Sequence, residues 1–296
     1  MVLELAGIHM MMPTPFDTNG KLDETFLAPL VNLAAETGCK GVVCLGEMGE
    51  HSRLTEAERE RIVKEVVKAA KGRLTVTVGA TGQSDYLGVQ NASLAKSIGA
   101  DAVMVAPPNT RKPNLDSVYS YYKAINEVPI TLVIQDFPEV NGVFMPPPFI
   151  ARLHNELANA KYLKLEDPPT PPKVTAVRAL TGDSLGIFGG LGGVFLLEEL
   201  TRGACGTMTG FAYPEVLVRV YSLLEAGALQ EAKEVFYKNV PLIRYEAQQG
   251  ISLRIRKELF FRRGVLGTAD VRPPGPSIDD TTKQELTELL AFLGFD

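Results

Sequence analysis

Eight short apolar segments alternate with longer segments of helical periodicity over the first 210 residues of the chain. The apolar segments are rich in Val, Ile, Leu and Met and occupy residues 8–12, 41–46, 75–80, 102–106, 130–135, 162–166, 185–189 and 207–210. Helical periodicity marks the intervening segments at 23–37, 55–71, 85–98, 114–127, 146–157, 171–181 and 193–202. Eight strands that alternate with helices predict a (β/α)8 TIM barrel, a fold of the α/β class.

A doubly wound parallel sheet is the main alternative to a barrel. No GxGxxG motif follows the first apolar segment, and eight near-equal repeats favour closure of the sheet. After residue 210 the pattern is helical only, with helices predicted at 214–226, 228–249, 251–263 and 279–293. We therefore expect a barrel core at 1–212, and a barrel-closing helix with a C-terminal helical extension of the same domain at 213–296.

Composition excludes several classes of protein. The 296 residues carry a formal net charge of −5, and 45% of them are hydrophobic, which is enough to bury a sizeable core. The mildly acidic balance disfavours nucleic acids and anionic membranes as partners, because both require a basic face. No apolar run is long enough to span a bilayer, and residues 1–12 carry no basic export signal, so we expect a cytoplasmic protein.

Cysteines and histidines are too scattered to indicate a metal site or a disulfide framework. The chain has three cysteines and three histidines, and none of them shows CxxC, HxH or HxxxH spacing. They are Cys39, Cys44, Cys205, His9, His51 and His154. The sequence therefore predicts neither a metal nor a cofactor.

The sixth predicted strand reads LKLED at 163–167, with a lysine and a glutamate between leucines. Because successive side chains of a strand point to opposite faces, Lys164 and Glu166 share one face. The active site of such a barrel lies at the C-terminal ends of its strands, and burial there lowers the pKa of a lysine and supplies a neutral amine that attacks ketones. The strand therefore predicts a Schiff-base lysine. A simple ion pair at the barrel rim accounts for the same tripeptide and stays open on the pattern alone.

Five motifs, in the right order over residues 7–292, make the chain resemble the dihydrodipicolinate synthase / N-acetylneuraminate lyase family of class I aldolases. They are PTPFD at 13–17, GEMGE at 46–50 followed by LTEAER at 54–59, APP at 106–108, the strand with Lys164, and GACG at 203–206. The resemblance implies a (β/α)8 barrel, a Schiff base between Lys164 and a small-molecule 2-keto acid, and a homotetramer or dimer.

Departures from the family pattern narrow the expected activity. Members that make dihydrodipicolinate carry GTTGE in the second-strand loop, where this chain has Glu47 and Met48 in place of the threonines. Gln135 replaces the tyrosine that leads the fifth-strand motif, and the arginine expected after that motif is absent from 139–141. The hydroxyl proton relay of the synthase is therefore missing, which argues against dihydrodipicolinate synthase activity.

Other motifs resemble the 2-keto-3-deoxy-L-arabinonate dehydratases, which also use Gln and a KxE pair. These motifs are QDxP at 135–138, KxE at 164–166, MTG at 208–210, PLI at 241–243 and QGI at 249–251. The second-strand loop, with Glu47 and Glu50, differs from the one expected in those enzymes. The resemblance implies dehydration of a 2-keto-3-deoxy sugar acid, with the sugar acid itself left open.

Three catalytic residues and five substrate-binding residues follow as candidates. Lys164 would form an imine with the C2 ketone, Glu166 would remove a C3 proton and return it to the departing C4 hydroxyl, and Gln135 would donate a hydrogen bond. The substrate-binding candidates are Glu47, Met48, Gly49, Gly190 and Thr209. Gly190 belongs to a glycine-rich loop that we expect to open a helix, where it either binds an anion or simply forms a tight turn.

Alternatives to the dehydratase remain. A pyruvate-dependent aldolase or hydratase-aldolase would split the C3–C4 bond through the same enamine, and a catalytically silent barrel would only bind keto acids. The basic residues between 254 and 263 suggest either a phosphate site or, as we expect, a solvated helix face paired with acidic neighbours.

Overall fold

The computed structural model describes residues 4–109, 112 and 114–295. Eight parallel strands close into a barrel in chain order, from β1 to β8 and back to β1. They are β1 Gly7–Met11, β2 Gly41–Cys44, β3 Thr75–Gly79, β4 Ala102–Val105, β5 Thr131–Asp136, β6 Ala160–Leu165, β7 Gly186–Gly189 and β8 Gly206–Thr209. Each predicted strand is present, so the (β/α)8 barrel is confirmed and the open doubly wound sheet is excluded.

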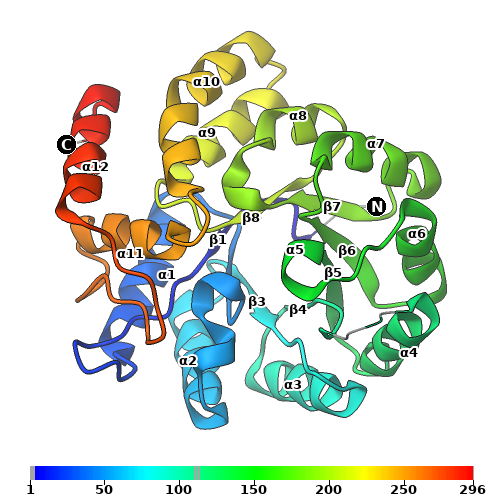
Figure 1. Cartoon of the computed structure of the whole chain (residues 1–296). Coiled ribbons are helices and arrows are strands. Elements are labelled where there is room, and N and C mark those ends of the chain that lie inside the picture. Colours follow the sequence, from blue (N-terminus) through cyan, green and yellow to red (C-terminus); the bar gives the residue numbers. More distant parts are fainter. Residues whose placement is uncertain (1–3, 110–111, 113, 296) are drawn as a thin grey trace.

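Helices surround the barrel, and three further helices lie on one side of it beyond α9 (Figure 1). The helices that follow the strands are α1 Leu27–Glu36, α2 Glu56–Ala70, α3 Asp85–Ile98, α4 Leu115–Asn126, α6 Pro147–Glu156, α7 Thr170–Thr181, α8 Leu196–Thr201 and α9 Pro214–Glu225. The extension consists of α10 Leu229–Glu246, α11 Ser252–Arg262 and α12 Asp280–Leu293. The C-terminal helical extension predicted from periodicity is therefore present.

Helix α2 shows how local sequence determines these elements. Thr55 and Glu58 form a reciprocal capping box, in which the Thr55 hydroxyl accepts from Glu58 N and the Glu58 carboxylate accepts from Thr55 N. Ile62, Val63 and Val66 are buried on one stripe of the helix, against the barrel. The cap supplies hydrogen-bonding partners to the first turn of α2, and the apolar stripe packs the helix against the barrel.

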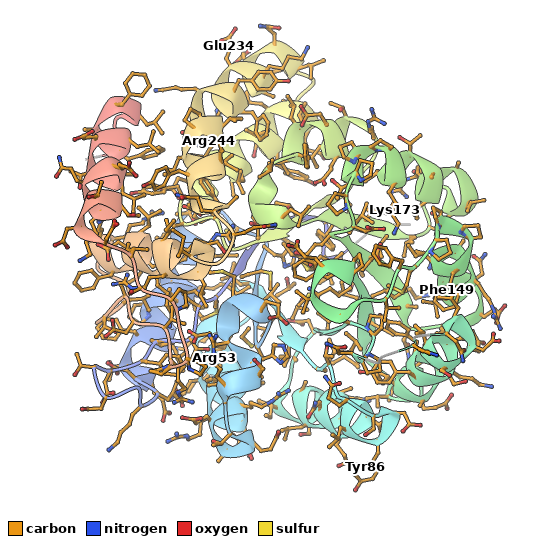
Figure 2. All side chains as sticks on the ribbon, viewed as in Figure 1. Arg53, Tyr86, Phe149, Lys173, Glu234 and Arg244 are labelled. Carbon is orange, nitrogen blue, oxygen red and sulfur yellow. The ribbon has the colours of Figure 1, made fainter. Side chains whose placement is uncertain are left out.

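The register between β5 and β6 determines which side chains enter the barrel. Gln135 is the register partner of Lys164, and Asp136 is the partner of Leu165. Side chains alternate along each strand, so Gln135 and Lys164 point to the same face. Asp136 points to the opposite face, where it contacts Lys173 of α7 (Figure 2).

Two local features were not predicted from the sequence. A short helix, α5 Pro138–Asn141, directly follows β5. Four residues are too few to show helical periodicity, although Pro138 occupies a first-turn position that favours helix formation. Helix α10 ends at Glu246, three residues before the predicted end at 249, and residues 248–251 form a loop over the barrel.

No helix in the described part of the chain is both long and apolar enough to cross a membrane.

Candidate active site

Lys164, Glu166 and Gln135 meet at the C-terminal end of the barrel. Lys164 Nζ lies 2.9 Å from Glu166 Oε2, and Gln135 Nε2 donates to the same oxygen at 2.8 Å. Only 2% of Lys164 and 5% of each of the other two residues is exposed, so their mutual contacts replace solvation. The structure thus contains the ion pair that the sequence left open, and places it inside the barrel.

A cavity of about 740 Å³ opens above this trio. Lys164 and Glu166 form part of its wall, and Met11 contributes its sulfur, which lies 3.1 Å from Lys164 Nζ. The remaining wall comes from loops after β2, β5, β6 and β7, from the end of β8 and the residue after it, and from the α10–α11 loop and the start of α11. The cavity therefore has the position of a barrel active site, at the C-terminal ends of the strands.

The loop after β2 contributes Glu47, Met48 and Gly49 in a single 3-10 turn. Gly49 N donates to Gly46 O within the turn, whereas the N–H groups of Glu47 and Met48 start it and have no acceptor inside it. Glu47 and Met48 line the cavity, but Gly49 is not part of the cavity wall. The first two residues of the turn therefore lie at the cavity, with N–H groups that have no partner inside the turn.

Glu47 pairs with His51 at the mouth of the barrel. His51 Nε2 lies 2.9 Å from Glu47 Oε1, and this hydrogen bond lowers the pKa of Glu47 below its ordinary value. Glu47 also borders a smaller cavity of about 200 Å³, which His51, Gln135 and Asn141 line as well. Glu47 therefore stands between the two cavities as a carboxylate.

Gly190 lies directly against the catalytic carboxylate candidate. A Cβ atom at this position would lie 2.5 Å from Glu166 Cγ, so that only glycine fits without moving Glu166. The loop leads into a helix as expected, but a 3-10 turn precedes that helix. Residues Leu191–Gly193 form a 3-10 turn with φ values of 47°, 72° and 81°, and α8 starts only at Leu196. A tight turn accounts for Gly192 and Gly193, because positive φ is costly for other residues.

Thr209 ends β8 and lines the main cavity. Its side chain is 4% exposed, and its Oγ1 has no hydrogen-bonding partner among the described residues. A buried hydroxyl without a partner is costly in an apolar wall, so its position at the cavity is consistent with a ligand contact.

Glu50 belongs to the wall of the main cavity, but its carboxylate is bound by residues of the helical extension. Its carboxylate lies 2.6 Å from Lys257 Nζ of α11, and both side chains are almost fully buried. Glu50 also bonds Arg53, which lies at the edge of the cavity (Figure 2), and accepts from Arg272 N. The pair joins the loop after β2 to the helical extension.

The basic segment at 254–263 is therefore only partly a solvated face. Its charged residues all lie near carboxylates, as expected: Arg254 and Arg262 near Glu258, Arg256 near Glu246, Lys257 near Glu50, and Arg263 near Glu215. The prediction of a solvated position is wrong for Lys257, which is fully buried, because helical periodicity alone does not reveal the buried Glu50 opposite it.

One acidic pair and one buried glutamate behind the strands were not predicted from the sequence. Lys173 Nζ of α7 lies 2.6 Å from Asp136 and 2.7 Å from Asp167, and burial raises the pKa of Asp136 to about 6. Glu199 accepts from Thr170 Oγ1, and burial raises its pKa to about 7. Asp136 in the QDxP motif was the available signal, but only the fold shows that it faces α7.

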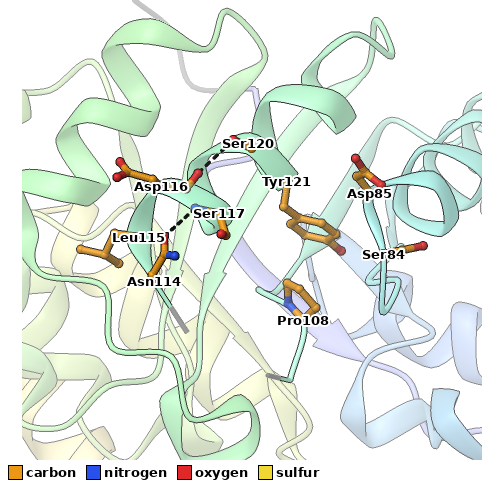
Figure 3. A pocket seen from close by; sticks show the side chains of 9 residues that line it. All are labelled: Ser84, Asp85, Pro108, Asn114, Leu115, Asp116, Ser117, Ser120 and Tyr121. Carbon is orange, nitrogen blue, oxygen red and sulfur yellow. Dashed lines mark hydrogen bonds between the residues drawn. The ribbon is translucent and has the colours of Figure 1, made fainter. Parts of the chain in front are cut away.

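A separate surface hollow lies between the start of α3 and the start of α4 (Figure 3). Its polar groups are engaged in the helix ends: Asn114 Oδ1 accepts from Ser117 N, and Ser84 caps α3. The hollow carries no lysine among its described lining residues. The buried trio and its cavity are therefore the stronger candidate site.

Comparison with known proteins agrees with this geometry. The model of the Dihydrodipicolinate synthetase family matches residues 4–292. The chain is 27% identical over 285 residues to the L-2-keto-3-deoxyarabonate dehydratase of Azospirillum brasilense, covering 95% of this chain and 92% of that protein. It is also 27% identical over 291 residues to a 4-hydroxy-tetrahydrodipicolinate synthase of Syntrophus aciditrophicus, with 97% and 98% covered.

Among solved structures, the dihydrodipicolinate synthase of Rhodopseudomonas palustris is similar over 98% of both chains, with a TM-score of 0.93 and 36% identity. The family model matches nearly the whole chain, and a solved relative of this identity has the same closed barrel. These findings assign the chain to one family. The chain belongs to the dihydrodipicolinate synthetase family.

Proposed function

We propose that this lyase-family barrel dehydrates a 2-keto-3-deoxy sugar acid, similar to 2-keto-3-deoxy-L-arabinonate, through a Schiff base on Lys164. The observation that supports this most is the buried trio of Lys164, Glu166 and Gln135 beneath a cavity at the barrel mouth. The similarity to a dehydratase of Azospirillum brasilense supports the same reaction class.

Imine formation begins with a proton transfer between the paired side chains. Glu166, 2.9 Å from Lys164 Nζ, accepts a proton from the ammonium and leaves a neutral amine. The amine attacks the C2 ketone, and the ketone oxygen leaves as water. Gln135 holds Glu166 in place through its amide and transfers no proton itself.

Elimination then follows at C3 and C4. The iminium draws electrons from C3, so Glu166 removes a C3 proton and an enamine forms. The enamine electrons expel the C4 oxygen, which takes the proton back from Glu166 and leaves as water. Hydrolysis of the remaining imine releases the dehydrated keto acid and returns Lys164, for a net loss of one water.

We expect the loop after β2 to bind the C1 carboxylate of the substrate. The N–H groups of Glu47 and Met48 start a turn that faces the cavity, and the Thr209 hydroxyl lies at the same wall. Gly190 leaves the space that Glu166 occupies.

Carbon–carbon cleavage by an aldolase or hydratase-aldolase, through the same Lys164 imine, is the second candidate reaction. Cleavage requires a base on the C4 hydroxyl, a task for which tyrosine is well suited. None of the described residues that line either cavity is a tyrosine, so this observation favours dehydration.

Borohydride trapping with pyruvate tests the Schiff base directly. We expect a covalent adduct on Lys164 in the intact protein and none in Lys164→Ala, whereas Lys161→Ala, on the exposed part of the same strand, keeps the adduct. An adduct that persists in Lys164→Ala would overturn the assignment. Product masses from 2-keto-3-deoxy-pentonates and -hexonates then separate loss of water from a split carbon chain.

A further inference from the structure

Arg256 differs from the other cations of its helix. Four cationic side chains between 254 and 263 lie within 3.1 Å of a carboxylate oxygen: Arg254, Lys257, Arg262 and Arg263. The Arg256 guanidinium comes no closer than 3.4 Å to Glu246, and its Nε has no hydrogen-bonding partner among the described residues. Because Nε is buried beside Glu246, the terminal Nη groups are the donors that a ligand can reach.

The guanidinium of Arg256 faces the main cavity. Arg256 belongs to the cavity wall together with Lys164 and Thr209, although it is carried by α11. Its Nη1 reaches Met48 Sδ at 3.6 Å, which is a weak acceptor. Its Nη2 lies 2.7 Å from where a Cβ of Gly192 would stand, so the glycine leaves room for the arginine. Only 12% of the side chain is exposed.

Glu246, behind Arg256, balances its charge incompletely. The Glu246 side chain is fully buried, and this burial raises its pKa to about 7 although Arg256 acts in the opposite direction. The contact between the two side chains, 3.4 Å from Arg256 Nε to Glu246 Oε2, is also long for a charge-assisted hydrogen bond. A nearly buried guanidinium that lacks a full counter-charge and faces a cavity is suited to an anion from outside the protein.

We propose that Arg256 is a substrate-binding residue that holds a carboxylate of the keto acid. The inference rests on the proposed role of the cavity as a 2-keto acid site. A planar guanidinium recognises a carboxylate through two parallel hydrogen bonds, so the residue would select ligands by charge and by geometry. The carboxylate is either the C1 group, shared with the loop after β2, or a second carboxylate at the far end of the substrate.

Calorimetric titration with three probes distinguishes these sources. Pyruvate and 2-oxobutanoate carry one carboxylate, and 2-oxopentanedioate carries two. We expect Arg256→Gln to raise the Kd by about ten- to a hundredfold, the usual cost of losing a charge-assisted hydrogen bond. A loss with all three probes assigns Arg256 to C1, and a loss with 2-oxopentanedioate alone assigns it to a second carboxylate.

Three further variants separate binding from folding. Arg254→Gln removes a cation of the same helix that does not line the cavity, and we expect it to leave the Kd unchanged. Glu246→Gln removes the competing carboxylate but can keep the acceptor for Ala212 N, so we expect tighter binding, by about threefold. Arg256→Lys keeps the positive charge but loses the paired donors of the guanidinium, so we expect its affinity to lie between those of Arg256→Gln and the wild type.

Unchanged Kd values in Arg256→Gln for every probe would overturn the proposal, and so would weaker binding in Glu246→Gln. The same titrations in a Lys164→Ala background keep this test independent of the Schiff base. If Arg256→Gln weakens binding there while borohydride traps no adduct in the intact protein, the carboxylate site stands and the imine mechanism fails. If the adduct forms but Arg256→Gln has no effect on the Kd, the imine mechanism stands and the carboxylate site at Arg256 fails.

Discussion

Glu50 and Lys257, 207 positions apart in the chain, form a buried ion pair of 2.6 Å between the loop after β2 and helix α11. Lys257 also donates to Asp270 O and lies 4.5 Å from the centre of the Phe16 ring. The pair therefore fixes the helical extension against the loop that carries Glu47 and Met48.

Removing Glu50 leaves Lys257 as a buried charge without this carboxylate, and removing Lys257 leaves the buried Glu50 with its contact to the partly exposed Arg53. We expect Glu50→Gln and Lys257→Met each to lower the free energy of unfolding by about 3–5 kcal/mol. The double variant should lose less than the sum of the two, because it buries no uncompensated charge. Urea unfolding of the four proteins measures the coupling, and strictly additive losses would show that the two side chains act independently.

Glu166→Gln tests whether Glu166 transfers the protons of the proposed reaction. The amide cannot accept or return a proton, so we expect kcat to fall by about 10²- to 10⁴-fold. The pyruvate adduct on Lys164 should still be trapped after long incubation, since the lysine remains. Gln135→Glu is the comparison, because it changes the group that contacts Glu166 and leaves the candidate base itself in place. A Glu166→Gln enzyme with full turnover would rule out Glu166 as the proton carrier.

Gly190→Ala probes the position of Glu166 by steric contact. The added methyl would lie 2.5 Å from Glu166 Cγ, and the φ of −147° at Gly190 lies outside the left-handed region. We expect a loss of turnover of at least tenfold with a smaller effect on the melting temperature, because Glu166 can move toward the cavity. Gly142→Asn is a suitable control at a left-handed position with open space around it. Equal activity of Gly190→Ala and the wild type would show that the location of Glu166 is not critical.

His9 makes stability depend on pH from inside the barrel. It is completely buried, Nε2 contacts Leu5 O at 2.7 Å, and Nδ1 has no partner among the described residues. Burial lowers the pKa of His9 from 6.5 to about 4, so the unfolded chain binds the proton first as the pH falls. Between pH 6.5 and 4 this should cost about 3 kcal/mol of stability.

The carboxyl groups of Glu199 and Glu246 act in the opposite direction. Their pKa values are raised to about 7, so the folded state binds more protons than the unfolded state between pH 4.5 and 7, and stability falls as the pH rises through that window. The His9 contribution is therefore isolated as the difference between wild type and His9→Gln in urea titrations at pH 4.5 and pH 7. An identical pH dependence of the two proteins would contradict it.

The periodicity of the chain was sufficient to predict the barrel, because strand and helix repeats are local properties that each segment displays by itself. Alternation within the sixth strand likewise predicted that Lys164 and Glu166 share a face. Both predictions needed only spacing along the chain. The residue types then suggested imine chemistry, and their catalytic roles remain proposals.

Tertiary structure alone decided which distant groups meet. Gln135 reaches Glu166 because β5 and β6 pair in one register, and Lys257 is buried because α11 folds back onto the loop after β2. The same folding places Arg256 at the cavity while its neighbour Arg254 stays away from it. A helical repeat shows which side chains share a face, but the burial and counter-charge of each depend on what packs opposite.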